Sequence, residues 1–316
     1  MVASSNSNRS YAAAHFALEL DDGQPGGLFK SIEGGSMRAD VMTYVAGNMQ
    51  DHWRQIGKPK FEDIKIQVGM AMSPRFYTWI AQFFTGNTVR HSGAIIAADF
   101  YYNERARRSF SYAMIKELTF PKLDANDKNA VYMTVGMAVE DIQFRVGSGE
   151  QIAQPKGMEG QKLWTANNFR FRLHGLDDFC RRTSKIDSFT IKQDVAEYHM
   201  GGLRAPTKFP GRIDYPNFTF YVPEADAGPF YAHAEAGIRS GQVNRMTAGL
   251  DILDNAQSVL CTVNIGNCDI IGVTPDRSDA TTEEIKMVKV ELYTEAMSLS
   301  YASLNVVNNG GSAVNA

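Results

Sequence analysis

Few residues of this sequence could do chemistry, and the strongest candidate is an acid beside an imidazole. Asp51 and His52 are adjacent, but a catalytic pair of this kind needs a nucleophile and a group that orients the imidazole. A hydrolase on a β-sandwich would rest on this pair alone. Trp53 follows at once, and an interface tryptophan with polar neighbours explains the stretch better. We therefore expect no catalytic residues and no enzyme activity.

Metal and phosphate chemistry have equally weak signals. The six histidines lack a ligand spacing such as His-x-x-x-His, so we predict no metal site and no cofactor. The glycine pairs at 34–35 and 201–202 are not phosphate loops, because no Gly-Lys-Ser/Thr follows them. Arg105, Arg107 and Arg108 could hold a phosphate, but we prefer a solvated hairpin tip.

Length and composition indicate a soluble protein of two domains. The chain has 316 residues and a formal charge of −3, and neither half is basic enough for a nucleic-acid binder. No apolar run of about 18 residues is present to span a membrane. The start lacks a secretory signal, so we expect the protein to stay where it is made. The chain has three cysteines, Cys180, Cys261 and Cys268. Because an odd number does not fit a disulfide framework, we predict that they are reduced and structural.

The sequence contains one long internal repeat. Shifted by 154 positions, residues 40–77 match residues 194–231 at nine of 38 ungapped positions, where average amino-acid usage gives about two. Phe16 aligns with Phe169 at a shift of 153. A period of this length indicates two fused globular units rather than a solenoid.

Each unit is predicted to be mainly β. Residues 73–84 form the best helix pattern, since Ser73 can cap the start and Phe76, Ile80 and Phe83 recur at helical spacing. A small β-sandwich or half-open barrel with one flanking helix suits such a unit. We divide the chain into a flexible arm (1–10), a first copy (11–150), a linker (151–162), a second copy (163–304) and a flexible tail (305–316).

Four finer expectations concern local structure. Residues 21–27 and 103–107 are rich in turn formers or charge and predict polar turns. Residues 131–145 and 215–222 each predict a single strand, the second buried on both faces.

Each copy also predicts a projecting arm. Residues 45–59 and 199–210 are polar and glycine-punctuated, yet both carry large apolar side chains. A long excursion inside a compact domain is uncommon unless it is functional, and its apolar side chains favour burial by a partner. The predicted interface residues are Tyr44, Gly47, Met49, Trp53, Ile56 and Pro59 on the first arm, and Tyr198, Gly201, Leu203, Phe209 and Pro210 on the second.

An ordered set of motifs runs through both copies. The first copy contains Ser31-Ile32-Glu33-Gly34-Gly35, Tyr44-x-x-Gly47, Gly57-Lys58-Pro59-Lys60-Phe61 and Phe76-Tyr77-x-Trp79-Ile80. The second contains Tyr198-x-x-Gly201, Phe209-Pro210-Gly211 and Val222-Pro223-Glu224-Ala225. Together they resemble the tail-tube protein family of contractile phages and related injection systems, over residues 13–146 and 167–303.

The resemblance implies sandwich domains whose sheets join sideways into a closed ring barrel of six units, with rings stacked into a tube. The implied partners are further copies of the chain, sheath, baseplate hub and tube terminator proteins, with DNA or effector proteins as cargo and no membrane. Assembly in the bacterial cytoplasm into a virion tail or phage-tail-like particle is implied as well. In that family the long loop reaches toward the neighbouring ring, which agrees with the arms inferred above.

Two units in one chain depart from the family pattern. Three chains would then complete a pseudo-hexameric ring, either as the repeating tube or as an adaptor between a three-fold baseplate hub and a six-fold tube. A ring built from first copies alone, with second copies outside, also stays open. From another class, the chain could be a monomeric β-sandwich binding or scaffold module. Polar strand faces should line the lumen, and the candidates are Glu140, Gln143, Lys289, Glu291 and Glu295.

We predict that Tyr44→Gly and Tyr198→Gly shorten or abolish tubes, because each removes a large apolar side chain from an arm that a partner buries. Tube length in electron micrographs measures the effect. Tubes of normal length from both variants would contradict a stacking role for the arms.

Overall fold

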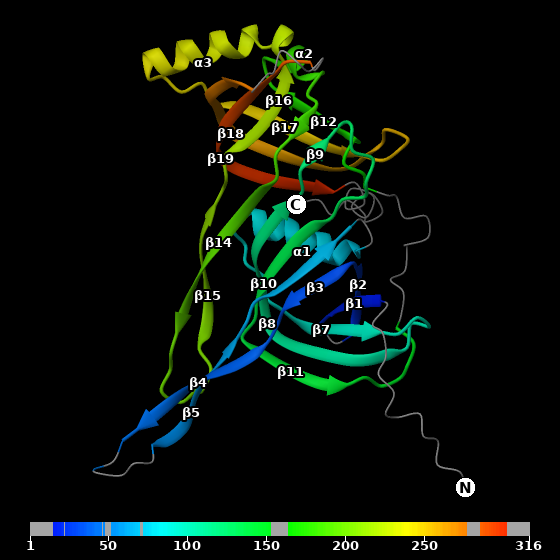
Figure 1. The fold of residues 1–316 in the computed structure, drawn as a ribbon, viewed down its shortest axis with the longest axis vertical. Coiled ribbons are helices and arrows are strands. Elements are labelled where there is room, and N and C mark those ends of the chain that lie inside the picture. The colour runs from blue at the N-terminus through cyan, green and yellow to red at the C-terminus, as the bar shows by residue number, and fades with distance from the viewer. Residues whose placement is uncertain are drawn as a thin grey trace, which may run out of the picture.

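The computed structural model describes residues 15–21, 23–45, 47, 52–69, 72–152, 164–276 and 285–301. Met49, Asp51, the two predicted terminal segments and most of the predicted linker lie outside these ranges. Two curved sheets follow one another along the long axis of the molecule, and both are built from antiparallel strands (Figure 1).

The first half of the chain forms one sheet with a helix packed on its apolar side. The strand path is β2-β1-β7-β8-β10-β6-β3, and β11 pairs with the remaining length of β8. The elements are β1 (His15–Leu20), β2 (Gln24–Phe29), β3 (Ser31–Gly34), β4 (Met37–Tyr44), β5 (Trp53–Phe61), β6 (Ile64–Val68), α1 (Pro74–Phe84), β7 (His91–Ala98), β8 (Glu104–Phe120), β9 (Leu123–Asp124), β10 (Met133–Ala138) and β11 (Asp141–Val146).

The second half forms another sheet, with the path β12-β17-β18-β19-β16-β13-β9. Its last strand, β9, comes from the first half of the chain. The elements are β12 (Phe169–Leu173), α2 (Asp177–Cys180), β13 (Lys185–Ile186), β14 (Phe189–Tyr198), β15 (Thr207–Asp214), β16 (Phe218–Pro223), the 3-10 turn η2 (Glu224–Asp226), α3 (Gly228–Ser240), β17 (Met246–Leu253), β18 (Val259–Pro275) and β19 (Met287–Tyr301).

Helix α1 begins where the sequence predicts. The Ser73 side chain caps it by accepting a hydrogen bond from the Phe76 N–H, and proline occupies the first turn. Ile80 is fully buried in the core, and the Trp79 indole N–H donates to the Val89 carbonyl at 2.9 Å. This bond satisfies the polar atom of a tryptophan that is 2% exposed.

The two sheets share a strand order and a register. The path β1-β7-β8-β10-β6-β3 runs through the first half in the same order as β12-β17-β18-β19-β16-β13 through the second. The residue numbers of equivalent positions in the two sheets differ by 153 to 155. Examples are Phe16↔Ala97 and Phe169↔Ile252, Gly93↔Phe110 and Ala248↔Ile265, and Ser31↔Gln67 and Lys185↔Tyr221.

The irregularities of the two sheets coincide as well. β8 skips one residue between Ile115 and Glu117 where it pairs with β10. β18 skips one residue between Ile270 and Gly272 where it pairs with β19, which is the same place at a shift of 155. Bulges locally re-aim a strand, so the two sheets bend at matching positions.

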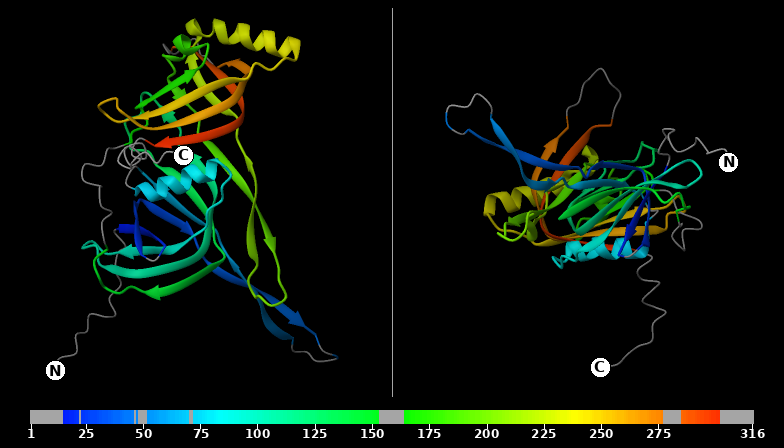
Figure 2. Two further views of the ribbon diagram at one scale, coloured as in Figure 1. Left: turned by 180° about the vertical axis from the view of Figure 1, so that it is seen from behind. Right: turned by 90° about the horizontal axis from the view of Figure 1, so that it is seen from below.

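Two hairpins project from the sheets toward the same end of the molecule (Figures 1 and 2). We call β4–β5 the first arm and β14–β15 the second arm. Gly57 and Gly211 occupy the same place on the two arms. A Cβ on Gly57 would lie 3.0 Å from the Asp40 carbonyl oxygen, and one on Gly211 would lie 2.9 Å from the Asp194 Cβ. Glycine keeps each bulged hairpin closely packed.

The polar turn predicted at 103–107 is wrong, because most of these residues lie on a strand, where Arg105 and Arg107 form ion pairs. β8 already begins at Glu104. Arg107 contacts both Glu19, at 2.7 Å, and Glu104, at 2.8 Å. Arg105 contacts Asp99 at 2.7 Å. Because these acidic partners are distant or irregularly spaced in the sequence, the cluster of arginines alone predicted a solvent-exposed turn.

Other local expectations are also wrong. Strand β2 replaces most of the predicted loop at 21–27, since Gly26 lets its backbone approach Leu18 closely. The predicted strand at 131–145 breaks into β10 and β11 around Glu140. The strand predicted at 215–222 begins only at Phe218 and has one half-buried face. The second half also has an additional short helix, α2, so it carries more than one flanking helix.

Candidate assembly interface

A backbone ladder joins the two halves. Phe189–Lys192 at the start of β14 pairs with the end of β8, placing Phe189 opposite Phe120 and Lys192 opposite Glu117. Next to it, Ile186 of β13 pairs with Leu123 of β9. The ladder satisfies backbone groups that would otherwise form exposed sheet edges. We call this contact the internal joint.

Apolar side chains fill the internal joint. The rings of Phe120 and Phe189 stack at 4.8 Å, and Phe189 also meets Phe218 edge-on at 5.3 Å. Leu118 and Ile191, the next opposed pair on the same face of the ladder, are both fully buried. The joint is therefore packed like a protein core rather than like a loose contact between domains.

A hydroxyl pair lies on the other face of the same ladder. Thr119 and Thr190 are directly opposed, and their hydroxyl oxygens are 2.9 Å apart. This pair fixes which residues face each other across the joint.

The second half also covers helix α1. Tyr77 of α1 stacks on Tyr301 at the end of β19, with ring centroids 4.0 Å apart. Burial, with a smaller contribution from Tyr301, raises the pKa of Tyr77 well above its usual value. The Tyr215 hydroxyl donates to the Phe84 carbonyl at 3.0 Å. Both ends of the outward face of α1 are thus covered by residues from the other half.

An ion pair holds the second arm against the first half. Arg90 and Glu140, 3.0 Å apart, form what we call the clamp. The Lys208 N–H of β15 donates to Glu140 Oε1 at 2.7 Å, and Arg90 Nη2 donates to the Lys208 carbonyl. Phe209 lies over the Arg90 guanidinium at 5.6 Å. The clamp thus binds both backbone groups of one arm residue with charge-assisted hydrogen bonds.

The predicted arm residues are largely exposed. Every residue of β4 is exposed, and Tyr44, Trp53 and Ile56 are 69%, 67% and 69% exposed. Two-stranded hairpins are at best marginally stable alone. Gly47 and Pro59 lie on the first arm, and Met49 lies outside the described residues. On the second arm all five predicted residues are exposed, namely Tyr198, Gly201, Leu203, Phe209 and Pro210.

The five predicted lumen residues occupy different settings. Glu140 belongs to the clamp and its side chain is only 14% exposed. Glu295 lies 3.6 Å from Arg245 at the edge of the second sheet. Gln143 is exposed on β11, while Lys289 and Glu291 contact each other on the polar face of β19.

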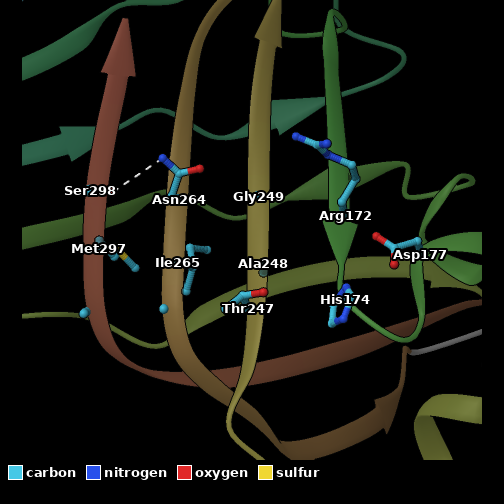
Figure 3. A pocket seen from close by; sticks show the side chains of 12 residues that line it. Arg172, His174, Asp177, Thr247, Ala248, Gly249, Asn264, Ile265, Met297 and Ser298 are labelled. Carbon is cyan, nitrogen blue, oxygen red and sulfur yellow. Dashed lines mark hydrogen bonds between the residues drawn. The ribbon is translucent and has the colours of Figure 1, made fainter.

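An open hollow of about 500 Å³ lies over the second sheet (Figure 3). Arg172, Gly249, Asn264 and Ser298 form one row across four adjacent strands. The Asn264 amide donates to the Ser298 hydroxyl at 3.5 Å. A polar row that is spread over a sheet suits a wetted surface better than a small-ligand site.

Metal-ligating groups do not gather within the described ranges. They contain no group of three His, Cys, Asp or Glu residues that could hold a metal ion. Burial raises the pKa of Cys180 and Cys261 to about 12 and that of Cys268 to about 11, so these free thiols stay protonated at neutral pH. His52 is exposed, and its neighbour Asp51 is not described. No helix in the described part is long and apolar enough to cross a bilayer.

Comparison with family models decides what the first half is. Residues 12–143 match the T4-like virus tail tube protein gp19 family. The first half carries a tail-tube domain. The resemblance inferred from its motifs is therefore confirmed over this range.

Several solved structures are similar to parts of the chain. The sheath-tube complex of PVC, an extracellular contractile injection system, aligns at 20% identity, covering 43% of this chain and 89% of that one, with a TM-score of 0.34. The tube-terminating cap of the anti-feeding prophage aligns at 21% identity, covering 49% and 98%, with a TM-score of 0.37. Hcp1 of E. coli EAEC 042 aligns at 19% identity, covering 44% and 94%, with a TM-score of 0.27. The sequence matches no curated protein.

Sequence reasoning missed the internal joint and the clamp. A signal for the clamp exists, because Arg90 and Glu140 correspond to Arg245 and Glu295 at a shift of 155. A shift of 154 does not align these residues, because the second half has one additional residue after its helix and the shift is 155 from there on.

We predict that Phe189→Ala lowers the free energy of unfolding by about 3–5 kcal/mol, because it removes the ring that packs between Phe120 and Phe218. Urea denaturation of the purified chain measures the loss. Phe100→Ala serves as the matched control: its ring is 75% exposed, so a change within about 0.5 kcal/mol is expected. Equal losses in the two variants would contradict a packed joint.

Proposed function

We propose that this chain is a structural tail-tube protein of a contractile phage tail or injection system, built from two tandem copies of the tube domain. Three chains assemble into a pseudo-hexameric ring around a lumen, and rings stack into a tube. The observation that carries the proposal is the internal joint, in which two halves of the same construction meet head to tail.

The shared register supports the duplication. The strand path, the ladder pairs and the skipped residues of the two sheets agree at shifts of 153 to 155. Independent domains can share an architecture, but matching bulges require matching insertions at each place. The family match ends at residue 143, so the second copy rests on this correspondence and on the sequence repeat.

The nature of the joint supports a ring. The first half contributes the end of β8 and helix α1, while the second contributes the start of β14 and the end of β19. The two surfaces in contact are different, which makes the contact heterologous. Repeated heterologous contacts produce rings when the rotation closes, and ring closure leaves no sheet edge exposed.

A polar sheet face supports a wetted lumen. The row of Arg172, Gly249, Asn264 and Ser298 has a counterpart in Glu19, Ala94, Ser109 and Gln143 of the first sheet. The charged residues of these rows form ion pairs with neighbouring side chains: Arg172 lies 3.0 Å from Asp251, and Glu19 lies 2.7 Å from Arg107. DNA or an effector protein can pass such a surface without sequence-specific binding, and sheath, baseplate hub and terminator proteins complete the particle, which is assembled in the bacterial cytoplasm.

A second candidate is an adaptor ring between a three-fold baseplate hub and a six-fold tube. The difference between the halves favours it, because β2 covers the edge of β1 in the first sheet, whereas β12 has the short helix α2 beside it instead. A trimer would therefore present alternating surfaces at three-fold spacing.

We expect the chain, expressed alone at high concentration, to form rings or stacked tubes in negative-stain electron micrographs. The closed joints hide apolar edges that a monomer exposes, which favours assembly. Indefinite stacking favours the repeating tube, and isolated rings favour the adaptor. Monodisperse monomers would contradict the proposal and favour a standalone binding or scaffold module.

A further inference from the structure

We infer that the internal joint is the template for the contact between neighbouring chains. The surface through which the first half forms the internal joint has a counterpart on the second half, and that counterpart is unoccupied. The surface through which the second half forms the joint likewise has an unoccupied counterpart on the first half. The partner is therefore a second copy of this chain, bound head to tail with defined residue pairs. The inference rests on the proposed tail-tube function and adds the register of its lateral contact.

The strand pairing follows from the register shifts. Thr119 on β8 corresponds to Thr274 on β18, and Thr190 on β14 corresponds to Ser36 just before β4. Ser36 of one chain therefore lies opposite Thr274 of the next, which preserves a pair of hydroxyl side chains across the ladder. β14 begins at Phe189, two residues before the counterpart of the first residue of β4. This difference is expected, because within one chain only β14 has a partner strand at this point.

Exposure marks these strands as unpaired counterparts. Ile191 is fully buried in the internal joint, whereas the corresponding Met37 is 57% exposed. Leu118 is fully buried, whereas the corresponding Val273 is only half-buried. Pairing Met37 with Val273 would give both apolar side chains the burial that their counterparts already have.

The clamp is present a second time without an arm. Arg245 and Glu295, which correspond to Arg90 and Glu140, lie 3.6 Å apart with side chains 66% and 40% exposed. The clamp of the first half binds the backbone of Lys208. The corresponding residue of the first arm is Arg54, whose backbone would bind Arg245 and Glu295 of the neighbouring chain.

An apolar helix face completes the match. Tyr231 and Ile238 of α3 are 37% and 64% exposed, although the corresponding Tyr77 and Phe84 of α1 are buried. The strand end that would cover α3 is that of β11, where Phe144 is 54% and Val146 is 92% exposed. Their counterparts on β19 are Leu299, which is 9% exposed, and Tyr301, which stacks on Tyr77.

The arrangement of the arms agrees with this contact. The second arm runs beside the first half of its own chain, while the first arm extends past the end of the molecule (Figure 1). Helix α3 lies at the opposite end, so one chain following another would bring the first arm beside a second half. The strand pair, the second clamp and the exposed face of α3 thus all find partners when the internal joint is repeated between chains.

The register can be tested by cysteine crosslinking of the full chain. Ser36→Cys combined with Thr274→Cys should form disulfides between chains on mild oxidation with diamide, since directly opposed Cβ atoms lie about 4.5–5.5 Å apart. Non-reducing gels should show products of two and three chains. The native thiols are all buried, and each single variant should stay at the mass of one chain.

Two matched pairs control the experiment. Thr119→Cys with Thr190→Cys reproduces the same geometry inside one chain, so its disulfide should form without a gain in mass. Met37→Cys with Thr274→Cys places the thiols on opposite faces of the ladder, and crosslinking should fall at least tenfold. Rings that form without the Ser36–Thr274 crosslink, or with equal crosslinking of the shifted pair, would overturn the inferred register and leave the proposed function standing. A chain that never associates would contradict both.

The second clamp gives an independent test. Glu295→Gln should weaken association of chains about tenfold, because it removes a charged acceptor from the arm backbone, and should leave the melting temperature of the chain unchanged. Glu140→Gln should lower that melting temperature, since its arm is already bound. Association measured by light scattering that is unaffected by Glu295→Gln would overturn the role of the second clamp.

Discussion

The antiparallel ladder between β8 and β14 is the interaction on which the rest of the structure depends. It buries Phe120 against Phe189, aligns the second arm with the clamp, and brings Tyr301 onto helix α1. Without it, the second arm would be a lone hairpin and α1 would expose an aromatic face. One backbone ladder therefore organises packing, electrostatics and the relative placement of the two halves.

The same constraint explains the surfaces that remain open. The first half contributes the end of β8 and helix α1 to this contact, whereas the second half contributes the start of β14 and the end of β19. Each half also carries the counterparts of the elements that the other half contributes. Under the proposed duplication, the two halves of one chain can satisfy only one such pair. The sides left over expose apolar residues such as Ile238 and Val146, which is costly for a solitary chain and useful for one that assembles.

The sequence predicted the parts of the fold that depend on local pattern. Ser73 and the spacing of Phe76 and Ile80 located α1, and the repeat with its glycines pointed to two projecting hairpins. The internal joint could not be found this way. Phe120 and Phe189 are distant in the sequence, and their counterparts, Pro275 and Gly35, are not aromatic, so no repeated motif marks the contact.

The surfaces proposed for assembly could be predicted only in part, because they too depend on contacts between residues that are distant in the sequence. Exposed apolar residues on the arms follow from composition, but what covers them depends on a tertiary register. Glu140 illustrates the limit: its position in the sequence suggested only a polar strand face, and the hydrogen bonds that its carboxylate accepts from Arg90 and Lys208 are visible only in the structure. Charged partners far apart in sequence are visible only after folding.

The central claim is that one joint, present inside the chain, is repeated between chains. The most direct measurement is a cryo-electron microscopy reconstruction of the assembled ring without imposed symmetry. The account predicts three chains whose halves alternate around the lumen, with the end of β18 beside the start of β4 of the next chain. A lumen lined by first halves alone, or halves of neighbouring chains meeting through any other strands, would contradict it.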